Sequence, residues 1–323
     1  MKKSFKIKFA ALIAVWACLI CLCACGEDEM PKRLDGMYSS TGSEVVSDEQ
    51  SVSSQHEGQT SSAVEADATE YSVPQFKSGD YTMSSTSTYE QYIYSGKNIV
   101  SLIKTSQTYT YAIKLTVNKN GSMSAVYKFA RIQTSYEGSD TDTMDTNDKS
   151  GNTGENTPYY DLIGQSFTVN VSKDYKLSVS GIDKIHKKFP DTAEIIDDDN
   201  MLEIAADLFY NIDGKLKIGS SWKMTQSGIT NTYKLSSVNK NNLVIDIIGG
   251  KLTVPDAFTS DSGFTYIYKA CNSLSGTLML NKSNRMIQEQ SSYQDNSGTI
   301  EYSGATYSFT ESVSSVCNIS NAK

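Results

Sequence analysis

The most constraining feature of this sequence is a strict alternation of side chains over residues 108–117, TYTYAIKLTV. Apolar or aromatic residues occupy the odd positions, and Thr or Lys occupies most of the even ones. A period of two predicts a β-strand with one buried and one hydrated face. The pair Asn120-Gly121 follows and suits a tight turn, and an apolar strand returns over 123–132. We therefore expect a β-hairpin over residues 108–132.

Similar short sequence segments recur later in the chain and indicate an internal duplication. They keep the same order in both halves, and an extra polar loop, YEGSDTDTMDTNDKSGNTGENTP, lengthens the first half. The matched pairs are VNKNG at 117–121 with VNKNN at 238–242, VNVSKDYKL at 169–177 with LMLNKSNRM at 278–286, and, more weakly, KSGDYTM at 77–83 with KIGSSWKM at 217–224. We predict two degenerate copies, 76–183 and 217–315, each a short antiparallel meander. Turn residues shared for local reasons are the alternative.

Between the copies the periodicity becomes helical, which predicts a connector over about 184–212. Asn200 followed by Glu203 is typical of a helix N-cap with a returning acid, so we expect a helix over 200–211. The residues expected on its apolar face are Met201, Ile204, Ala205, Leu208 and Phe209.

A second, shorter helix is predicted over 182–188, ending before Pro190 because proline disfavours a helical residue ahead of it. We expect these helices to cover one face or end of the sheet. The sequence therefore predicts an α+β fold, predominantly antiparallel β, over residues 75–323, as one large domain or two small ones.

The N-terminus has the pattern of a secretory signal over residues 1–24. Four lysines within the first eight residues precede an uncharged apolar stretch, 9–24. That stretch is shorter than the roughly 20 apolar residues that cross a bilayer, and an acidic run follows it, so we expect cleavage.

The cleavage site itself, Leu22-Cys23-Ala24-Cys25, resembles the lipobox of bacterial lipoproteins. The resemblance implies a diacylglycerol thioether on Cys25, cleavage just before it, and room for acylation, for example by palmitate, of the new N-terminus. A zinc cluster would need these cysteines and their neighbours, Cys18 and Cys21, to survive as thiolates, which an uncharged apolar run disfavours. We expect a protein anchored to the cell membrane by lipid and facing outside the cytoplasm.

Residues 25–74 have the composition of a disordered tether. They are rich in Ser, Thr and acids, and eleven acidic residues stand against Lys32 and Arg33, a net charge of -9. The remaining residues, 75–323, carry 23 basic and 26 acidic residues, a net of -3. Their only adjacent basic pair is Lys187-Lys188, and no basic stripe is present, so we expect no nucleic-acid partner.

A wider resemblance rests on DLIGQSFTVNVSKDYKLSVSGIDKI, a helical segment, IGSSW, and SGTLMLNKSNRMIQEQ. In this order they are similar to an uncharacterised family of bacterial cell-envelope lipoproteins, over most of residues 76–300. The family's usual G-D-S-W is altered by Ser220. The resemblance implies location and fold, and it implies no activity.

Catalytic groups are scarce. The two histidines are His56, in the tether, and His186, beside lysines, and the sequence contains no nucleophile elbow, zinc helix or phosphate loop. The run Asp197-Asp198-Asp199 fits a position before a helix N-terminus. The acids of the polar loop, Asp140, Asp142, Asp145 and Asp148, depart from the order of a calcium hand. We expect no cofactor, no metal and no enzyme.

Two cysteines, Cys271 and Cys317, remain after processing. Outside the cytoplasm they can oxidise, so a disulfide between them and two buried thiols are both open. The many tyrosines suit either a β core or a surface that stacks on sugars, and we favour the core.

Three functions remain. We favour a non-enzymatic binding or interaction module of the cell envelope, with an unknown ligand or partner protein. A curved sheet that carries lipid or another apolar ligand is the alternative. A carboxylate-dependent envelope hydrolase is the third.

Overall fold

The structure is a computed structural model. It describes residues 69–138, 141–206, 208–210, 212, 214–226, 229–249, 257–260, 263–271 and 275–322. The predicted signal, Cys25 and almost all of the predicted tether lie outside the described residues. No helix among the described residues is both long and apolar enough to span a membrane.

Strands dominate the described part of the chain. They are β1 Tyr71–Ser72, β2 Gly79–Ser95, β3 Asn98–Val117, β4 Met123–Glu137, β5 Thr141–Asp145, β6 Ser166–Val171, β7 Leu177–Ser180, β8 Lys215–Leu216, β9 Ser221–Gln226, β10 Ile229–Val238, β11 Asn242–Ile248, β12 Phe258–Thr259, β13 Thr265–Cys271, β14 Ser275–Asn281, β15 Ile287–Tyr302 and β16 Ala305–Asn321. The helices are α2 Thr157–Leu162, α3 Ile182–Lys188 and α4 Asp198–Ala206, with short 3-10 turns at Lys149–Gly151, Gly154–Asn156 and Pro190–Glu194.

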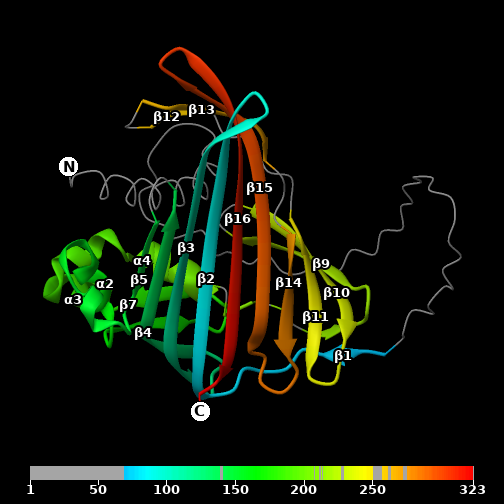
Figure 1. The fold of residues 1–323 in the computed structure, drawn as a ribbon. Helices are drawn as coiled ribbons and strands as arrows, with labels where there is room; N and C mark the ends of the chain where they lie inside the picture. The colour runs from blue at the N-terminus through cyan, green and yellow to red at the C-terminus, as the bar shows by residue number, and fades with distance from the viewer. Residues whose placement is uncertain are drawn as a thin grey trace, which may run out of the picture.

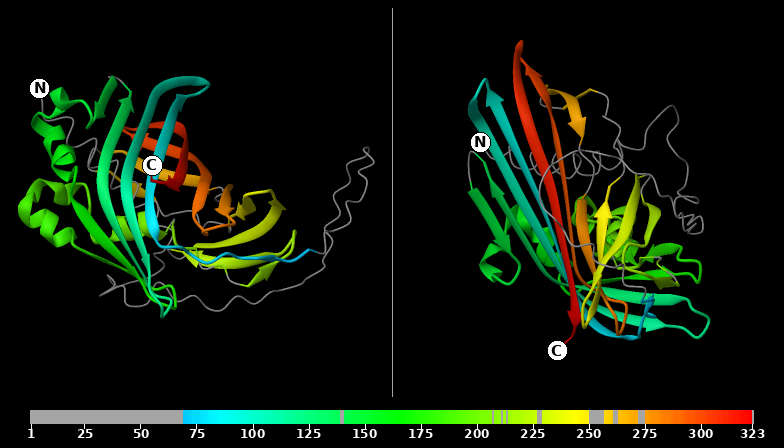
Figure 2. Two further views of the ribbon diagram at one scale, coloured as in Figure 1. Left: turned by 90° about the horizontal axis from the view of Figure 1, so that it is seen from below. Right: turned by 90° about the vertical axis from the view of Figure 1, so that its right-hand side faces the viewer.

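One antiparallel sheet of fourteen strands organises the molecule. Its main order is β7-β6-β4-β3-β2-β16-β15-β14-β11-β10-β9, with β5, β12 and β13 attached at its margins. The first half of the chain runs outward from β2 to β7. The second half starts at the far edge with β9 and returns to β16, which pairs with β2. The sheet is curved, and helices α2–α4 lie over one face beside β3–β7 (Figures 1 and 2).

The predicted hairpin over 108–132 is confirmed, although its strands β3 and β4 are longer than expected. Residues 104–117 of β3 pair with 123–137 of β4. Tyr111, Ile113 and Leu115 are buried, while Lys114 is exposed. Gly121 has φ 85°, which the turn requires. The second predicted hairpin, β10 with β11, is also present.

The helical connector follows the prediction in part. Helix α3 matches it, and Phe189 ends the helix before Pro190. Helix α4 begins at Asp198, two residues earlier than predicted, because the Asp197 carboxylate accepts the backbone N–H of Asn200 (2.7 Å). Asn200 is therefore not the cap. The helix ends at Ala206, so the apolar residues Leu208 and Phe209 are buried outside it.

Two further expectations need correction. The folded part begins before residue 75, because β1 pairs with β8 and Val73 is buried. The extra polar loop is partly regular, since β5 pairs with residues 133–137 of β4 and α2 begins at its end.

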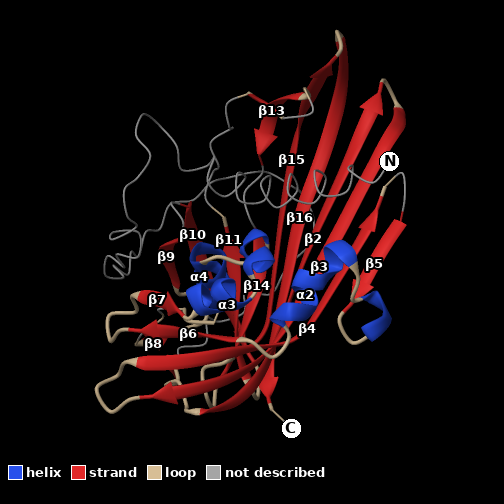
Figure 3. Ribbon diagram, turned by 90° about the vertical axis from the view of Figure 1, so that its left-hand side faces the viewer, coloured by secondary structure: helices blue, strands red, loops and turns tan. Residues whose placement is uncertain are grey.

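The main hydrophobic core lies between the lower part of the sheet and the connector. It unites inward side chains of both halves, such as Met83 and Ile245, with Ile185, Met201 and Leu208 of the connector. A second, small core forms further up the sheet from Tyr268, Ile300 and Phe309. Figure 3 shows that the helices are confined to the lower level, while the β2–β3 and β15–β16 hairpins project beyond it.

Candidate functional site

The residues singled out in the sequence do not converge on one site. His186 is half-buried in α3, and its Nε2 donates to the carbonyl oxygen of Ile196 (2.9 Å), which ties α3 to the connector. Asp197 caps α4, as its position before a helix N-terminus predicted. Both residues have structural contacts.

Two acids of the polar loop, Asp145 and Asp148, are engaged in local contacts, and Asp140 lies outside the described residues. Arg131 donates to both carboxylate oxygens of Asp145, and together with the backbone N–H of Asn147 it holds the pKa of Asp145 at about 2. Asp148 accepts both the backbone N–H and the hydroxyl of Ser150, and these bonds lower its pKa. No group of three metal-binding side chains is found among the residues that the structure describes.

The two late cysteines lie on opposite sides of β15. Cys271, on β13, is opposite Asn296, whereas the buried Cys317, on β16, is opposite Gln290. Positions 290 and 296 are about 20 Å apart along a strand. A disulfide needs Cα atoms within about 7 Å. A bridge between the two cysteines is therefore incompatible with this register.

Several tyrosines are part of the core, as favoured from the sequence. Tyr111 lies edge-on to Tyr127, with ring centroids 5.7 Å apart, and Tyr127 stacks on Phe167 at 5.1 Å. Burial raises the pKa of Tyr111 well above its usual value. On the other face of the sheet, Tyr92 and Tyr94 stack at 6.5 Å.

Between the two cores, the inner face of the sheet carries a line of uncharged polar side chains. We name it the polar row. Strand pairing places one such residue of each of five adjacent strands side by side: Thr134, Gln107, Ser87, Ser315 and Ser292. All five are partly exposed, in contrast to the buried residues of the cores. The hydroxyls of Ser292 and Ser315 lie 2.7 Å apart.

A buried carboxylate lies above the polar row, four residues before Ser315 on the same face of β16. Glu311 is 2% exposed and accepts hydrogen bonds from Tyr89 (2.9 Å), Gln91 (3.4 Å) and Asn296 (3.0 Å). We call these four residues the Glu311 network. Within the described residues no basic side chain pairs with Glu311, so neutral donors satisfy it. Burial, followed by the Glu311 charge, raises the pKa of Tyr89 well above its usual value.

Strand β13 covers the Glu311 network. Tyr266 and Tyr268 pack edge-on against Phe309, with centroids 5.7 and 5.2 Å apart. Burial also raises the pKa of Tyr266. A carboxylate enclosed in this way is held in one geometry by its donors, and it has the character of a structural group.

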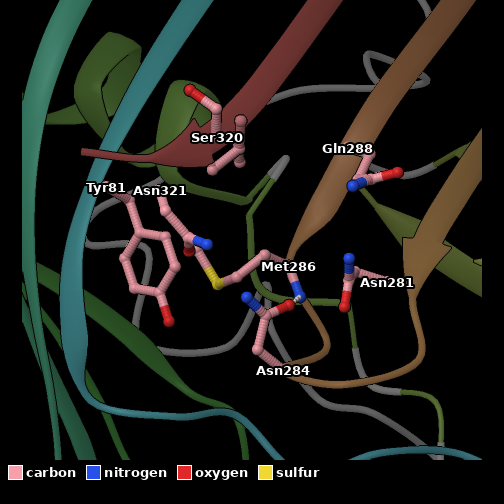
Figure 4. Close-up of a pocket in the computed structure, with 8 residues that line it drawn as sticks. Tyr81, Asn281, Asn284, Met286, Gln288, Ser320 and Asn321 are labelled. Atoms are coloured by element: carbon pink, nitrogen blue, oxygen red, sulfur yellow. Dashed lines mark hydrogen bonds between the residues drawn. The ribbon is translucent and has the colours of Figure 1, made fainter. Parts of the chain in front are cut away.

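A small polar cavity lies at the lower end of the sheet, where β16 ends beside the β14–β15 turn (Figure 4). Its volume is about 40 Å³, and its lining residues are Tyr81, Asn281, Asn284, Met286, Gln288, Ile319, Ser320 and Asn321. Asn281 caps the turn by accepting the Ser283 N–H (2.8 Å). The volume is enough for one or a few water molecules. These amides therefore organise the turn.

Neither the polar row nor the Glu311 network was predicted from the sequence. Residues 84–88, SSTST, are polar at every position, so they show that the segment is polar but not which face of it would be shared. Pairing of β2 with β16 brings residues from opposite ends of the chain together, and periodicity within one strand cannot show that.

Comparisons with known proteins assign no family. No family model matches the sequence, and no curated protein matches it. Among solved structures, one described as lipid–protein interactions in lipovitellin is similar over 77% of this chain and 26% of that chain, with a TM-score of 0.45 and 11% identity. The chain spans about a quarter of that protein's length, and a likeness this distant assigns neither a family nor a function.

Proposed function

We propose that this chain is an extracytoplasmic lipoprotein, anchored to the cell membrane through Cys25, whose sheet is a non-enzymatic binding module for a neutral polar ligand of the cell envelope. Glycans are the ligand class that fits best. The polar row is the observation that carries the binding proposal. The lipobox resemblance supports the anchor, and the segments DLIGQSF, IGSSW and SGTLMLNKSNRMIQEQ support membership of the uncharacterised lipoprotein family.

The chemistry of the polar row supports a neutral ligand. Hydroxyl and amide groups both donate and accept hydrogen bonds, and they carry no charge that would select an ion. The row is partly exposed and is flanked by Tyr109, whose hydroxyl accepts from Gln107 (2.7 Å). A few convergent polar groups beside aromatic rings are typical of sites for small polar molecules.

Glycan binding can be tested with a pair of neighbouring substitutions on β2. Ser87→Val removes a hydroxyl from the polar row, while Thr86→Val is a matched control on the opposite face, where Thr86 contacts Thr108 (2.9 Å). On a glycan array we expect the full chain to bind a discrete set of neutral glycans, and Ser87→Val alone to lose them. Equal losses in both variants, or no binding by the unsubstituted chain, would reject the proposal.

The anchor can be tested separately in cells that express the full chain. With labelled fatty acid we expect label in the membrane fraction, and we expect Cys25→Ala to abolish it. Cys23→Ala is the control, because alanine is equally small at that position and should leave the label in place. Labelling that persists in Cys25→Ala would reject the anchor.

The lipid-carrier alternative requires apolar space on the concave side of the sheet. The lower part of that side is occupied by the connector side chains Leu208, Phe209, Tyr210 and Ile212. Native mass spectrometry of the full chain would reveal a copurified lipid beyond the covalent anchor, and its presence would favour the carrier.

We also propose that the two halves arose by duplication. Two features support this. The strands β2-β3-β4-β6 and β9-β10-β11-β14 follow one another across the sheet in the same direction. The matched sequence segments also lie at equivalent turns of the two sets. The turns also share local contacts. Ser172 and Asn281 each accept the backbone N–H two residues ahead, at 3.2 and 2.8 Å.

A further inference from the structure

The upper part of β3 is an open sheet edge. Residues 98–103 pair with β2 on one side, and β4 first pairs with β3 at Lys104, opposite Glu137. On the side facing away from β2, no described strand pairs with residues 98–103. This segment has the sequence NIVSLI, which contains neither a charge nor a proline. We call it the open edge.

The open edge is exposed as well as apolar. Ile99 is 57% exposed and Val100 is 53% exposed, the two highest values among the large hydrophobic residues described. Val100 is the extra residue in an irregularity of the β2–β3 register, between Ile99 opposite Tyr94 and Ser101 opposite Ile93. Figure 2 shows the β2–β3 hairpin projecting beyond β4 and β5, beside the β15–β16 hairpin. Unpaired backbone groups on such an edge are a ready template for another strand.

Other edges of the sheet are protected in the usual ways. Strand β7 has only four residues, β5 carries Asp142 and Asp145, and β9 carries Lys223. Short length and charge both discourage pairing with foreign strands. The open edge lacks these protections along its six residues.

The upper part of β15 forms the corresponding edge on the other side of the two long hairpins, and it shows which kind of strand such an edge can accept. Strand β14 pairs with β15 only up to Tyr293, and beyond that point β13 pairs with residues 296–301 of β15. Strand β15 flanks the central β2–β16 pair on one side as β3 does on the other. The chain thus covers one of two corresponding edges with an apolar and aromatic strand, TYIYKAC, and no described strand covers the other.

We propose that the open edge is a docking site for an extended segment of a partner polypeptide, added as an antiparallel strand. The partner segment has apolar or aromatic residues on both faces, as β13 has, because Ile103 and Leu102 occupy opposite faces of β3. An acidic residue at its C-terminal end would match Lys97, whereas Lys104 at the other end of the edge is already ion-paired with Glu90.

A second copy of this chain fits the open edge less well. Antiparallel pairing of residues 98–103 with themselves, in full register, would bring Lys97 of one copy to the position opposite Lys104 that Glu137 of β4 already occupies. The β2–β3 turn of each copy would therefore collide with the end of β4 of the other. A short segment of a different polypeptide meets no such obstacle.

A labelled peptide with the sequence of residues 265–270, TYIYKA, and one aspartate at its C-terminal end is the probe. Fluorescence polarisation with the full chain in detergent should show saturable binding, and hydrogen exchange should show new protection of residues 98–103. The double variant Ile99→Lys, Val100→Lys places lysines on the open edge and should weaken binding at least tenfold. Val126→Lys is the control, since Val126 is 39% exposed but its strand is paired on both sides.

Several results would overturn the proposal. They are the absence of saturable binding up to about 1 mM peptide, equal weakening in the double variant and the control, and protection that appears on β15 in place of β3. Sedimentation of the full chain adds a further test, because a dimer that dissociates in the double variant would assign the open edge to a second copy.

Discussion

Arg285 offers the sharpest test of what holds the two halves together. Its side chain is 1% exposed and lies in the turn between β14 and β15. The guanidinium donates to the carbonyl oxygens of Tyr210 (2.9 Å) and Ile212 (2.7 Å) in the connector. It also lies over the ring of Phe76, 4.8 Å from its centroid. One side chain thus joins a turn of the sheet, the connector and the start of the folded chain.

We expect Arg285→Ala to lower the free energy of unfolding by about 4 kcal/mol. Two hydrogen bonds from a charged donor contribute about 1.5–3 kcal/mol each, and the contact with Phe76 adds about 1 kcal/mol. The total falls toward the lower end because the Tyr210 carbonyl also accepts the Ile212 N–H (3.1 Å). Arg285 has φ 62°, and alanine shares that backbone strain with arginine, so strain does not enter the difference.

Urea unfolding followed by tryptophan fluorescence measures this effect. Arg285→Met fills much of the volume without the donors, so it should retain the packing and lose about 2–4 kcal/mol. Arg131→Ala is the control, because its ion pair with Asp145 is about a third exposed and should contribute less than about 1 kcal/mol. A loss below about 1 kcal/mol in Arg285→Ala would refute the reasoning.

Three further predictions concern titration and capping. Because Arg131 holds the pKa of Asp145 at about 2, the stabilisation from this ion pair is present above about pH 4 and is lost as the pH falls toward 2. In acid titrations monitored by circular dichroism, Asp145→Asn should reduce the change in stability between pH 4 and pH 2, and it should cost less than about 1 kcal/mol at neutral pH. Because the pKa of Tyr89 is raised, the contribution of Tyr89 to the free energy of unfolding is complete below about pH 10 and is lost as the pH rises further. Tyr89→Phe should reduce this loss of stability at alkaline pH in urea titrations. The same variant should cost about 1–2 kcal/mol at neutral pH because Glu311 loses a donor. Asp197→Ala should cost about 1 kcal/mol in urea unfolding through the lost helix cap, and an unchanged midpoint would contradict that role.

Local features of the fold were predictable because they depend on residues near one another in the chain. The β3–β4 hairpin follows from alternation and a glycine turn, and α3 ends where Pro190 requires. The start of α4 was missed because two residues three apart could each serve as the cap, and the carboxylate of Asp197 was the one used. Periodicity alone did not separate these alternatives.

The candidate site was not predictable because its residues come from both ends of the chain. Ser87 and Ser315 are register partners on β2 and β16, and Tyr89 donates to Glu311 222 positions away. Each strand alone indicates only a polar face. The sequence left a disulfide between Cys271 and Cys317 open for the same reason, since both cysteines lie beside β15 at positions that only the register shows to be distant.

The pairing of β2 with β16 explains why these distant groups form one surface. This seam runs from Tyr81 opposite Asn321 to Tyr94 opposite Ser308, and among the strands that the structure describes no other pairing joins the two halves of the main sheet. Its inner face carries part of the lower core, then Ser87 and Ser315, then the Glu311 network. The seam also sets the two long hairpins side by side, one edge covered by β13 and the other left open among the described residues. Because the polar row crosses the seam, a ligand on the row would contact a surface that exists only when the two halves are paired, whereas the open edge lies on β3, one strand away from the upper end of the seam.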